Sequence, residues 1–346
     1  MNVMFCFKEK LLAKNSNYLL CYSKGCLVLK DYFFNNIKKI RICPRIKSFR
    51  LVERLFRKEP RTAVSLNDYS FLVSYNGGAY ILNTDSFSFY CLHKYSKGMN
   101  NPLSFLVCKD NDGKVLEILY GEYIWNDEKG PVSIYRYDLR KWECVYSFPE
   151  KTIKHIHNIT YDDYKKRYLI LTGDENEESA IWQANKDFSS VTKIIGGKQI
   201  HRSCLCLPTE HGIYYTTDTP LSNNHLFFLK NDNSLEELFQ ISGPCIYGVI
   251  KDNAMYFATS VEGDPTVGKF RYRFFNKLGK GVKDRFVYIM KYQKGGPLEE
   301  IAKFKKDILP MWLFQFGNAT FVEHNGDIYF STQSTKKKGT YKIIED

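Results

Sequence analysis

The chain has 346 residues, enough for one large β domain or two ordinary domains, and its 44% hydrophobic and 25% charged residues exclude a disordered protein. The net charge of +12 favours anionic partners. The positive charge is dispersed, however, with only short runs such as Lys336–Lys338. Because zinc-finger spacing and a basic helix are also missing, nucleic acid is not expected as a partner.

No apolar run reaches the roughly 20 residues of a membrane span, and the first ten residues lack the pattern of a signal peptide. We therefore expect no membrane span and a cytoplasmic protein, or a secreted one if a signal peptide precedes this sequence. The ten cysteines include no Cys-x-x-Cys pair, and Cys204 and Cys206 lie in an apolar run. This usage predicts free thiols in a reducing compartment.

Short apolar runs alternate with turn signals along the chain. Residues 18–22 and 26–29 flank Ser-Lys-Gly, and residues 71–75 and 79–82 flank Asn-Gly-Gly. Later runs cover residues 168–172, 212–217, 254–260 and 327–332. Glycine turns between such runs are typical of β-hairpins, and the 25 Tyr and 25 Phe fit half-buried strands. Helical periodicity is confined to residues 48–58, for which an outer strand and loop is an equal alternative, and residues 298–305.

The strand-like runs recur in units of roughly 45–55 residues, within the range of propeller blades. We place about seven units, with six or eight as alternatives, at residues 18–45, 63–95, 100–148, 152–197, 200–240, 243–305 and 315–346. No Pro/Gly/Ser-rich linker divides the chain. The sequence therefore predicts an all-β fold, a single β-propeller domain over residues 1–346 with four-stranded blades.

Polar, titratable side chains are concentrated between Lys154 and Arg202. His155 and His157 are two residues apart, so a strand would present them side by side on one face. Imidazoles act as acid or base near pH 7 and also bind divalent metals, so a metal held by this pair stays open. Arg202 suits a bidentate grip on a carboxylate. The structural alternatives are one packed and one surface histidine, and a salt bridge for Arg202.

Further candidates follow other strand-like runs. Glu122 is a candidate general acid or metal ligand, and Tyr123 beside it a candidate base. Asp174 and Asp218 recur at equivalent places in consecutive units, which favours turn capping as much as ligand binding. The predicted catalytic residues are His155, His157, Arg202, Tyr247 and Glu122. The predicted substrate-binding residues are Asn158, His201, Tyr123, Asp174 and Asp218.

Two segments, Ile134–Trp142 and Ala180–Val191, resemble degenerate Asp-box hairpins, the motif of sialidase-like (BNR-repeat) propellers. Asp138 and Trp142 keep the Asp and the aromatic residue of the motif, Arg140 replaces its glycine, and the second copy keeps Asp187 without the Trp. The resemblance implies a carbohydrate-active or carbohydrate-binding propeller. It does not carry over the sialidase mechanism, because the three arginines and the Tyr–Glu pair cannot be placed.

A looser resemblance is chemical. His155, His157, His201, Arg202 and Tyr247 supply the residue types that surround the funnel of propeller polysaccharide lyases, some of which add a metal held by histidines. This likeness implies β-elimination on an acidic, uronate-containing polysaccharide or oligosaccharide. Arg202 would neutralise the carboxylate, a histidine would remove the proton, and Tyr247 or the other histidine would protonate the leaving oxygen.

Two rival functions stay open. A sialidase-like glycoside hydrolase would use a carboxylate pair such as Glu122 and Asp174. A non-catalytic propeller that binds glycans or proteins would lack a close His–Arg–Tyr cluster. The sequence determines neither the glycan nor the oligomeric state.

Overall fold

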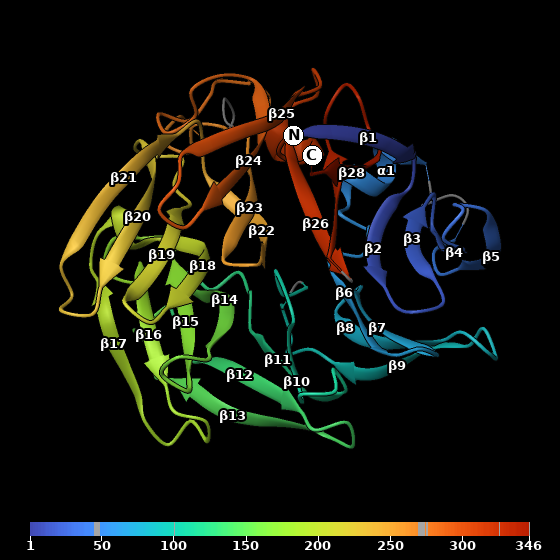
Figure 1. The fold of residues 1–346 in the computed structure, drawn as a ribbon, viewed down its shortest axis with the longest axis horizontal. Coiled ribbons are helices and arrows are strands. Elements are labelled where there is room, and N and C mark those ends of the chain that lie inside the picture. Colours follow the sequence, from blue (N-terminus) through green and yellow to red (C-terminus); the bar gives the residue numbers. More distant parts are fainter. Residues whose placement is uncertain (45–48, 100, 269–273, 275, 325, 346) are drawn as a thin grey trace. The chain divides into compact units, whose positions relative to one another are not determined.

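The computed structural model describes residues 1–44, 49–99, 101–268, 274, 276–324 and 326–345, and these form seven four-stranded sheets. Each sheet is antiparallel, and its strands follow one another in chain order, except that the last sheet takes β1 as its fourth strand. The protein is an all-β, seven-bladed β-propeller, as the sequence predicts. Figure 1 shows the blades in chain order from blue to red.

The chain divides into two compact units, and each is described by itself. Unit 1 comprises Met1–Glu59, Tyr215–Phe228 and Glu236–Asp346, and unit 2 comprises Pro60–Tyr214 and Leu229–Leu235. The sheet formed by β18 (Ser203–Thr209), β19 (Gly212–Thr217), β20 (Asn224–Lys230) and β21 (Leu235–Ile241) is not contained in one of them.

Unit 1 contains three complete blades. The first consists of β2 (Lys10–Lys14), β3 (Leu19–Ser23), β4 (Cys26–Lys30) and β5 (Asn36–Arg41). The second consists of β22 (Cys245–Lys251), β23 (Ala254–Thr259), β24 (Phe286–Gln293) and β25 (Leu298–Lys305). The third joins β26 (Asn318–His324), β27 (Asp327–Gln333) and β28 (Thr340–Ile344) to β1 (Asn2–Phe7).

Unit 2 also contains three complete blades. The first consists of β6 (Ala63–Asn67), β7 (Ser70–Tyr75), β8 (Gly78–Asn83) and β9 (Phe89–Lys94). The second consists of β10 (Leu106–Lys109), β11 (Val115–Gly121), β12 (Val132–Tyr137) and β13 (Trp142–Phe148). The third consists of β14 (His155–Asp162), β15 (Arg167–Gly173), β16 (Ala180–Ala184) and β17 (Val191–Gly196). Leu119, Ile134, Ile156 and Ile170, each at most 1% exposed, pack the second of these blades against the third.

Hairpin turns form where the sequence predicts them. Lys24 and Gly25 join β3 to β4 with φ of 48° and 74°, and Asn76 and Gly77 join β7 to β8 with φ of 46° and 79°. Two successive residues with positive φ define a type I′ turn, whose twist matches that of the flanking strands. The glycine explains why these turns form at low cost.

The aspartates of the two Asp-box-like segments, Asp138 and Asp187, lie in the turns between the third and fourth strands of their blades. Asp138 Oδ1 accepts hydrogen bonds from the backbone N–H groups of Arg140 (2.9 Å) and Lys141 (2.8 Å), and Asp187 Oδ1 accepts one from Ser189 (3.0 Å). Asn83 makes the same contacts after β8. These are Asx turns, general turn chemistry that does not single out a sialidase.

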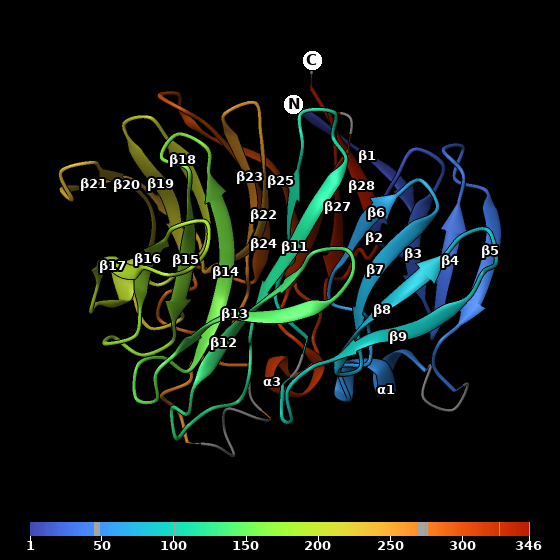
Figure 2. The same cartoon turned by 90° about the horizontal axis from the view of Figure 1, so that it is seen from below.

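The helices differ in part from what the sequence predicts. Within residues 48–58, α1 covers Arg50–Leu55, whereas Ser48 lies outside the described residues. In unit 1, α1 lies beside α3 (Met311–Phe314), and Arg54 Nε donates to Phe314 O at 2.8 Å (Figure 2). The helix predicted at residues 298–305 is wrong: this segment is strand β25, because pairing with β24 overrides a short apolar periodicity. Among the described residues, no helix is long and apolar enough to cross a membrane.

The predicted boundaries of the first and last blades need correction. The first blade begins at Lys10 rather than near residue 18, and the last blade is completed by residues 2–7. The strand at residues 10–14 carries a lysine at each end, Lys10 and Lys14, although both side chains are buried. This charge masks its strand pattern in the sequence.

Candidate functional site

Strand β14 presents His155 and His157 next to each other in unit 2. The pairing of β14 with β15 shifts register between Ile156 and Asn158, so His157 is the extra residue of a β-bulge. The two imidazole Nε2 atoms lie 3.2 Å apart, and both side chains are buried, with 6% and 3% exposure. The predicted side-by-side arrangement of the two histidines is therefore present.

Asp174 and Arg202 complete what we call the histidine cluster: His155, His157, Asp174 and Arg202. Asp174 follows directly after β15, and its Oδ2 and Oδ1 lie 3.4 Å and 3.5 Å from the Nε2 atoms of His155 and His157. Arg202 Nη2 lies 2.8 Å from Asp174 Oδ1, and Nη1 donates to the Asp174 backbone oxygen at 3.2 Å. All four residues belong to unit 2.

The other ring nitrogens of the histidines face backbone carbonyls. His155 Nδ1 lies 3.3 Å from Ile124 O, and His157 Nδ1 lies 3.0 Å from Ser203 O. A carbonyl oxygen only accepts, so each Nδ1 carries the hydrogen. In the neutral form, both Nε2 atoms therefore direct lone pairs towards each other and towards the Asp174 carboxylate.

Asp174 is held as a carboxylate. Burial opposes its ionisation, but the positive charge of the Arg202 guanidinium and the close contacts with the His155 and His157 imidazoles outweigh this effect and hold the pKa of Asp174 well below its usual range. Its side chain is 37% exposed, whereas the two imidazoles are almost fully covered. The carboxylate is thus the member of the cluster that a ligand reaches from solvent.

Gly173 allows the cluster to assemble. A Cβ atom at this position would lie 2.8 Å from both His157 Cε1 and Arg202 Cγ, a distance that real Cβ contacts do not show. Gly173 pairs with His155 in the β14–β15 ladder. A side chain here would push His157 or Arg202 away from Asp174.

Tyr123 and Arg61 flank the cluster. The ring centroid of Tyr123 lies 4.3 Å from that of His155, and the Arg61 guanidinium carbon lies 5.1 Å from the Tyr123 ring centroid. Arg61 Nη1 also donates to Asn101 O at 3.1 Å. Tyr123 is among the residues predicted from the sequence, whereas Arg61 is not, because the lone basic residue of a Pro-Arg-Thr loop carries no motif.

Glu122 and Asn158 have structural partners, and His201 is buried. Both carboxylate oxygens of Glu122 accept hydrogen bonds, from the Ser96 hydroxyl and from the Ser133 N–H at 2.8 Å. Asn158 accepts from Ser104 Oγ (2.6 Å) and donates to Cys204 O (2.8 Å), which ties β14 to its neighbours. His201, on the short 3₁₀ turn Gln199–His201, is buried, and burial lowers its pKa.

Tyr247 and Asp218 lie in unit 1. Tyr247 belongs to β22 and pairs with Ala258 of β23, and its side chain is half-buried. Asp218 is buried just after β19. Within its unit, the Asp218 carboxylate contributes to raising the pKa of the Cys245 thiol to about 12, although burial of the thiol is the main cause. Neither residue is placed relative to the histidine cluster.

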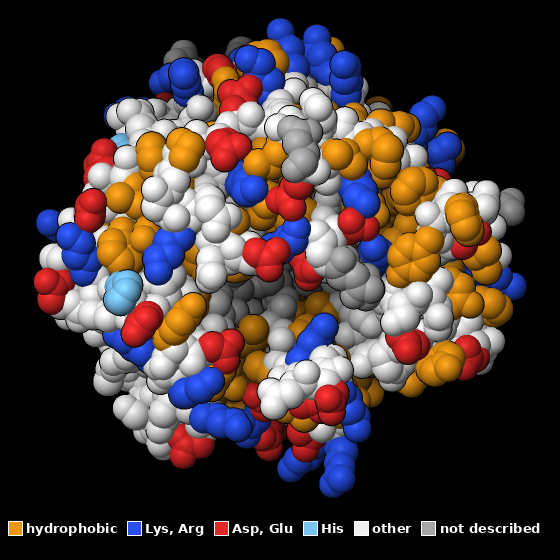
Figure 3. Space-filling view, in the orientation of Figure 1, with side chains coloured by type: hydrophobic (Ala, Val, Ile, Leu, Met, Phe, Trp, Pro, Cys, Tyr) orange, Lys and Arg blue, Asp and Glu red, His pale blue; other side chains and the backbone are white. Residues whose placement is uncertain are grey.

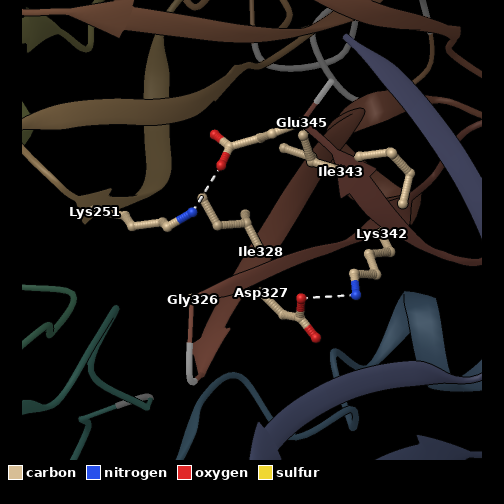
Figure 4. A pocket seen from close by; sticks show the side chains of 8 residues that line it. Lys251, Gly326, Asp327, Ile328, Lys342, Ile343 and Glu345 are labelled. Atoms are coloured by element: carbon tan, nitrogen blue, oxygen red, sulfur yellow. Dashed lines mark hydrogen bonds and ion pairs between the residues drawn. The ribbon is translucent and has the colours of Figure 1, made fainter.

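A separate pocket of about 230 Å³ lies in unit 1, between β27, β28 and Lys251 of β22 (Figure 4). Its lysines are paired with carboxylates: Lys251 Nζ lies 2.8 Å from Glu345 Oε2, and Lys342 Nζ lies 2.7 Å from Asp327 Oδ1. Four mutually neutralised charges give the pocket no evident preference for a charged ligand.

On the face shown in Figure 3, Lys and Arg side chains alternate with Asp and Glu rather than forming one large patch. The net charge of +12 therefore does not by itself mark a binding surface on that face.

Comparisons with known proteins support the fold alone. No protein-family model matches the chain, and no curated protein matches it. Among solved structures, it is similar to PorZ, a bacterial surface component of the type-IX secretion system of Porphyromonas gingivalis (10% identity, TM-score 0.51), with 98% of this chain and 37% of that chain covered.

Two further structures are similar to the same degree. The extracellular domain of BT4673 from B. thetaiotaomicron has 11% identity and a TM-score of 0.52, with 99% of this chain and 38% of that chain covered. The designed protein Ika8 has 7% identity and a TM-score of 0.51, with 97% of each chain covered. The chain thus spans little more than a third of PorZ and of the BT4673 domain. These structural neighbours are diverse propellers, and none of them points to a sialidase.

Proposed function

We propose that unit 2 binds an acidic, uronate-containing glycan and cleaves it by β-elimination at the histidine cluster and Tyr123. The observation that carries the proposal is the convergence of two imidazoles, one phenol and one guanidinium in one unit, with 4.3 Å between the ring centroids of Tyr123 and His155. In elimination, a base removes the proton from the carbon that bears the carboxylate, and a carbon–carbon double bond forms. The bond to the glycosidic oxygen breaks, and this oxygen departs with a proton. The step is redox-neutral, so acid–base groups and one positive centre suffice.

The contacts of Glu122 favour elimination over hydrolysis. A hydrolase needs two carboxylates facing the same bond. Glu122 is buried and hydrogen-bonded through both oxygens, whereas Asp174 is partly exposed and bound to Arg202. A purely glycan-binding propeller does not require the His–Arg–Tyr grouping that unit 2 contains.

The test is an assay of acidic polysaccharides for the ultraviolet absorbance of the unsaturated uronate product. We expect absorbance to rise with at least one uronate polymer. His157→Ala should reduce the rate of cleavage by about 10²–10⁴-fold, the range for the loss of one positioned proton-transfer group. His211→Ala, at an exposed histidine in the same unit, should leave the rate unchanged. Reducing ends released from a neutral glycan, without absorbance from any uronate polymer, would contradict the proposal.

A further inference from the structure

The donor atoms of His155, His157 and Asp174 are spaced as the ligands of a metal ion are. The two Nε2 atoms lie 3.2 Å apart, His155 Nε2 lies 3.4 Å from Asp174 Oδ2, and His157 Nε2 lies 3.5 Å from Asp174 Oδ1. Tetrahedral zinc with nitrogen and oxygen ligands at about 2.0–2.1 Å requires neighbouring ligand atoms about 3.3–3.5 Å apart. One ligand atom from each residue lies within 4.8 Å of the other two, so one ion can bind both imidazoles and the carboxylate after small side-chain rotations.

The orientation of the imidazoles supports the same conclusion. Each Nδ1–H is directed at a carbonyl oxygen, Ile124 O or Ser203 O, so both Nε2 lone pairs converge. Two lone pairs and a carboxylate repel one another unless a positive charge lies between them. A backbone carbonyl behind each metal-binding histidine is also the usual arrangement that fixes its tautomer.

Arg202 and Gly173 hold the third donor. The Arg202 guanidinium contacts both Oδ1 and the backbone oxygen of Asp174, and these two contacts fix the orientation of the carboxylate. Gly173 leaves room for Arg202 and His157 to approach each other. The donors are thus positioned by surrounding groups rather than by chance proximity on a mobile surface.

We propose that His155 Nε2, His157 Nε2 and a carboxylate oxygen of Asp174 bind one divalent transition-metal ion, with zinc as the best fit. Three protein ligands leave a fourth position, and the partial exposure of Asp174 opens it to solvent. Zinc sites with three protein ligands and one open position are typical of catalysis rather than of structural support.

The role of the ion in elimination rests on the proposed function, whereas the site itself does not. Arg202 is paired with Asp174, which offsets part of its positive charge. A cation in the open-sided cluster would add further positive charge for the uronate carboxylate. The histidine nitrogens would then be occupied as ligands, which leaves Tyr123 beside His155 to accept the proton as a phenolate and, as the resulting phenol, to return it to the departing glycosidic oxygen.

Direct metal binding tests the site. The chelator-treated 346-residue chain is titrated with Co²⁺ and Zn²⁺, and binding is followed by the visible absorption of tetrahedral Co²⁺ and by calorimetry. We expect one ion per chain at the cluster and displacement of Co²⁺ by Zn²⁺. His155→Ala, His157→Ala and Asp174→Asn should each weaken binding by at least about 100-fold, since loss even of supporting contacts costs 10–100-fold. His211→Ala is the control that should bind as before.

The outcomes separate the two proposals. A folded protein, by circular dichroism, that gives no tetrahedral Co²⁺ spectrum overturns the metal site, as does binding that survives His157→Ala. Should Co²⁺ bind while no uronate polymer is cleaved, the metal site stands and the lyase fails. Cleavage at an unchanged rate after chelation would retain the lyase and exclude the metal from its mechanism.

Discussion

At the residue scale, Gly173 is the position on which the histidine cluster depends most. Gly173→Ala would insert a methyl group 2.8 Å from His157 Cε1 and Arg202 Cγ. Because the neighbours must move, we expect a loss of about 1–3 kcal/mol in the free energy of unfolding, as for other overpacked sites. Co²⁺ affinity should fall by at least about tenfold, since the ligands lose their support.

The matched control is Gly130→Ala in the same unit. A Cβ at Gly130 would meet only Asn126 Oδ1, at an ordinary 3.6 Å. Chemical denaturation measures the free energy of unfolding of both variants, and Co²⁺ titration measures their affinity for the ion. Equal affinity in Gly173→Ala and Gly130→Ala would show that the cluster does not depend on this close approach.

From the i, i+2 rule of a strand, the sequence predicted that His155 and His157 lie side by side, but not the β-bulge at His157. It named Asp174 as a substrate-binding candidate but did not predict that its carboxylate meets the two imidazoles. Gly-Asp at the end of a strand reads as a turn, and only the β14–β15 register, with His155 opposite Gly173, brings the carboxylate to the imidazoles. The carbonyls of Ile124 and Ser203 carry no sequence signal at all.

At the element scale, two type I′ turns differ in one informative residue. Lys24 adopts φ of 48° and Asn76 adopts 46° at equivalent positions, although this left-handed region costs a non-Gly, non-Asn residue about 1–2 kcal/mol. Lys24→Asn should therefore stabilise the protein by about 1 kcal/mol, and Asn76→Lys should destabilise it by a similar amount. Urea denaturation of the two variants measures both changes, and two changes of the same sign would refute the turn argument.

Elements with strong turn signals were predictable, and those set by pairing were not. Asn-Gly and Lys-Gly fix β-hairpins locally. Residues 298–305 contain the spacing of a short helix, but β24 offers a complete hydrogen-bonded partner, and the segment is a strand. The strand Lys10–Lys14 was missed because its terminal lysines are buried rather than exposed.

At the scale of the whole molecule, the repeat could be predicted from the sequence because each blade consists of similar hairpins. The completion of the last blade could not be predicted, because β1 pairs with β28 across more than 300 residues: Val3 lies opposite Ile343 and Phe5 opposite Tyr341. In Figure 1, β1 (dark blue) lies beside β28 (red). The local sequence of residues 2–7 does not indicate which strand they pair with.

This pairing predicts complementation. Deleting residues 1–8 removes a ladder whose hydrogen bonds contribute about 1 kcal/mol each, so Tm should fall. A synthetic peptide of residues 1–8 added in excess should restore part of the loss, and a scrambled peptide should not. Scanning calorimetry measures all three; a deletion variant that melts like the full chain would show that β1 adds nothing to the blade.

The β-bulge at His157 has counterparts in unit 1. The register also shifts around Leu12 in β2 and around Ile246 in β22, near the start of the first strand of each blade. The same backbone irregularity thus accommodates leucine, isoleucine or histidine. The side chain at the bulge position can therefore change without a change in strand pairing: one codon can add or remove an imidazole there while the hydrogen-bond ladder of the blade stays intact.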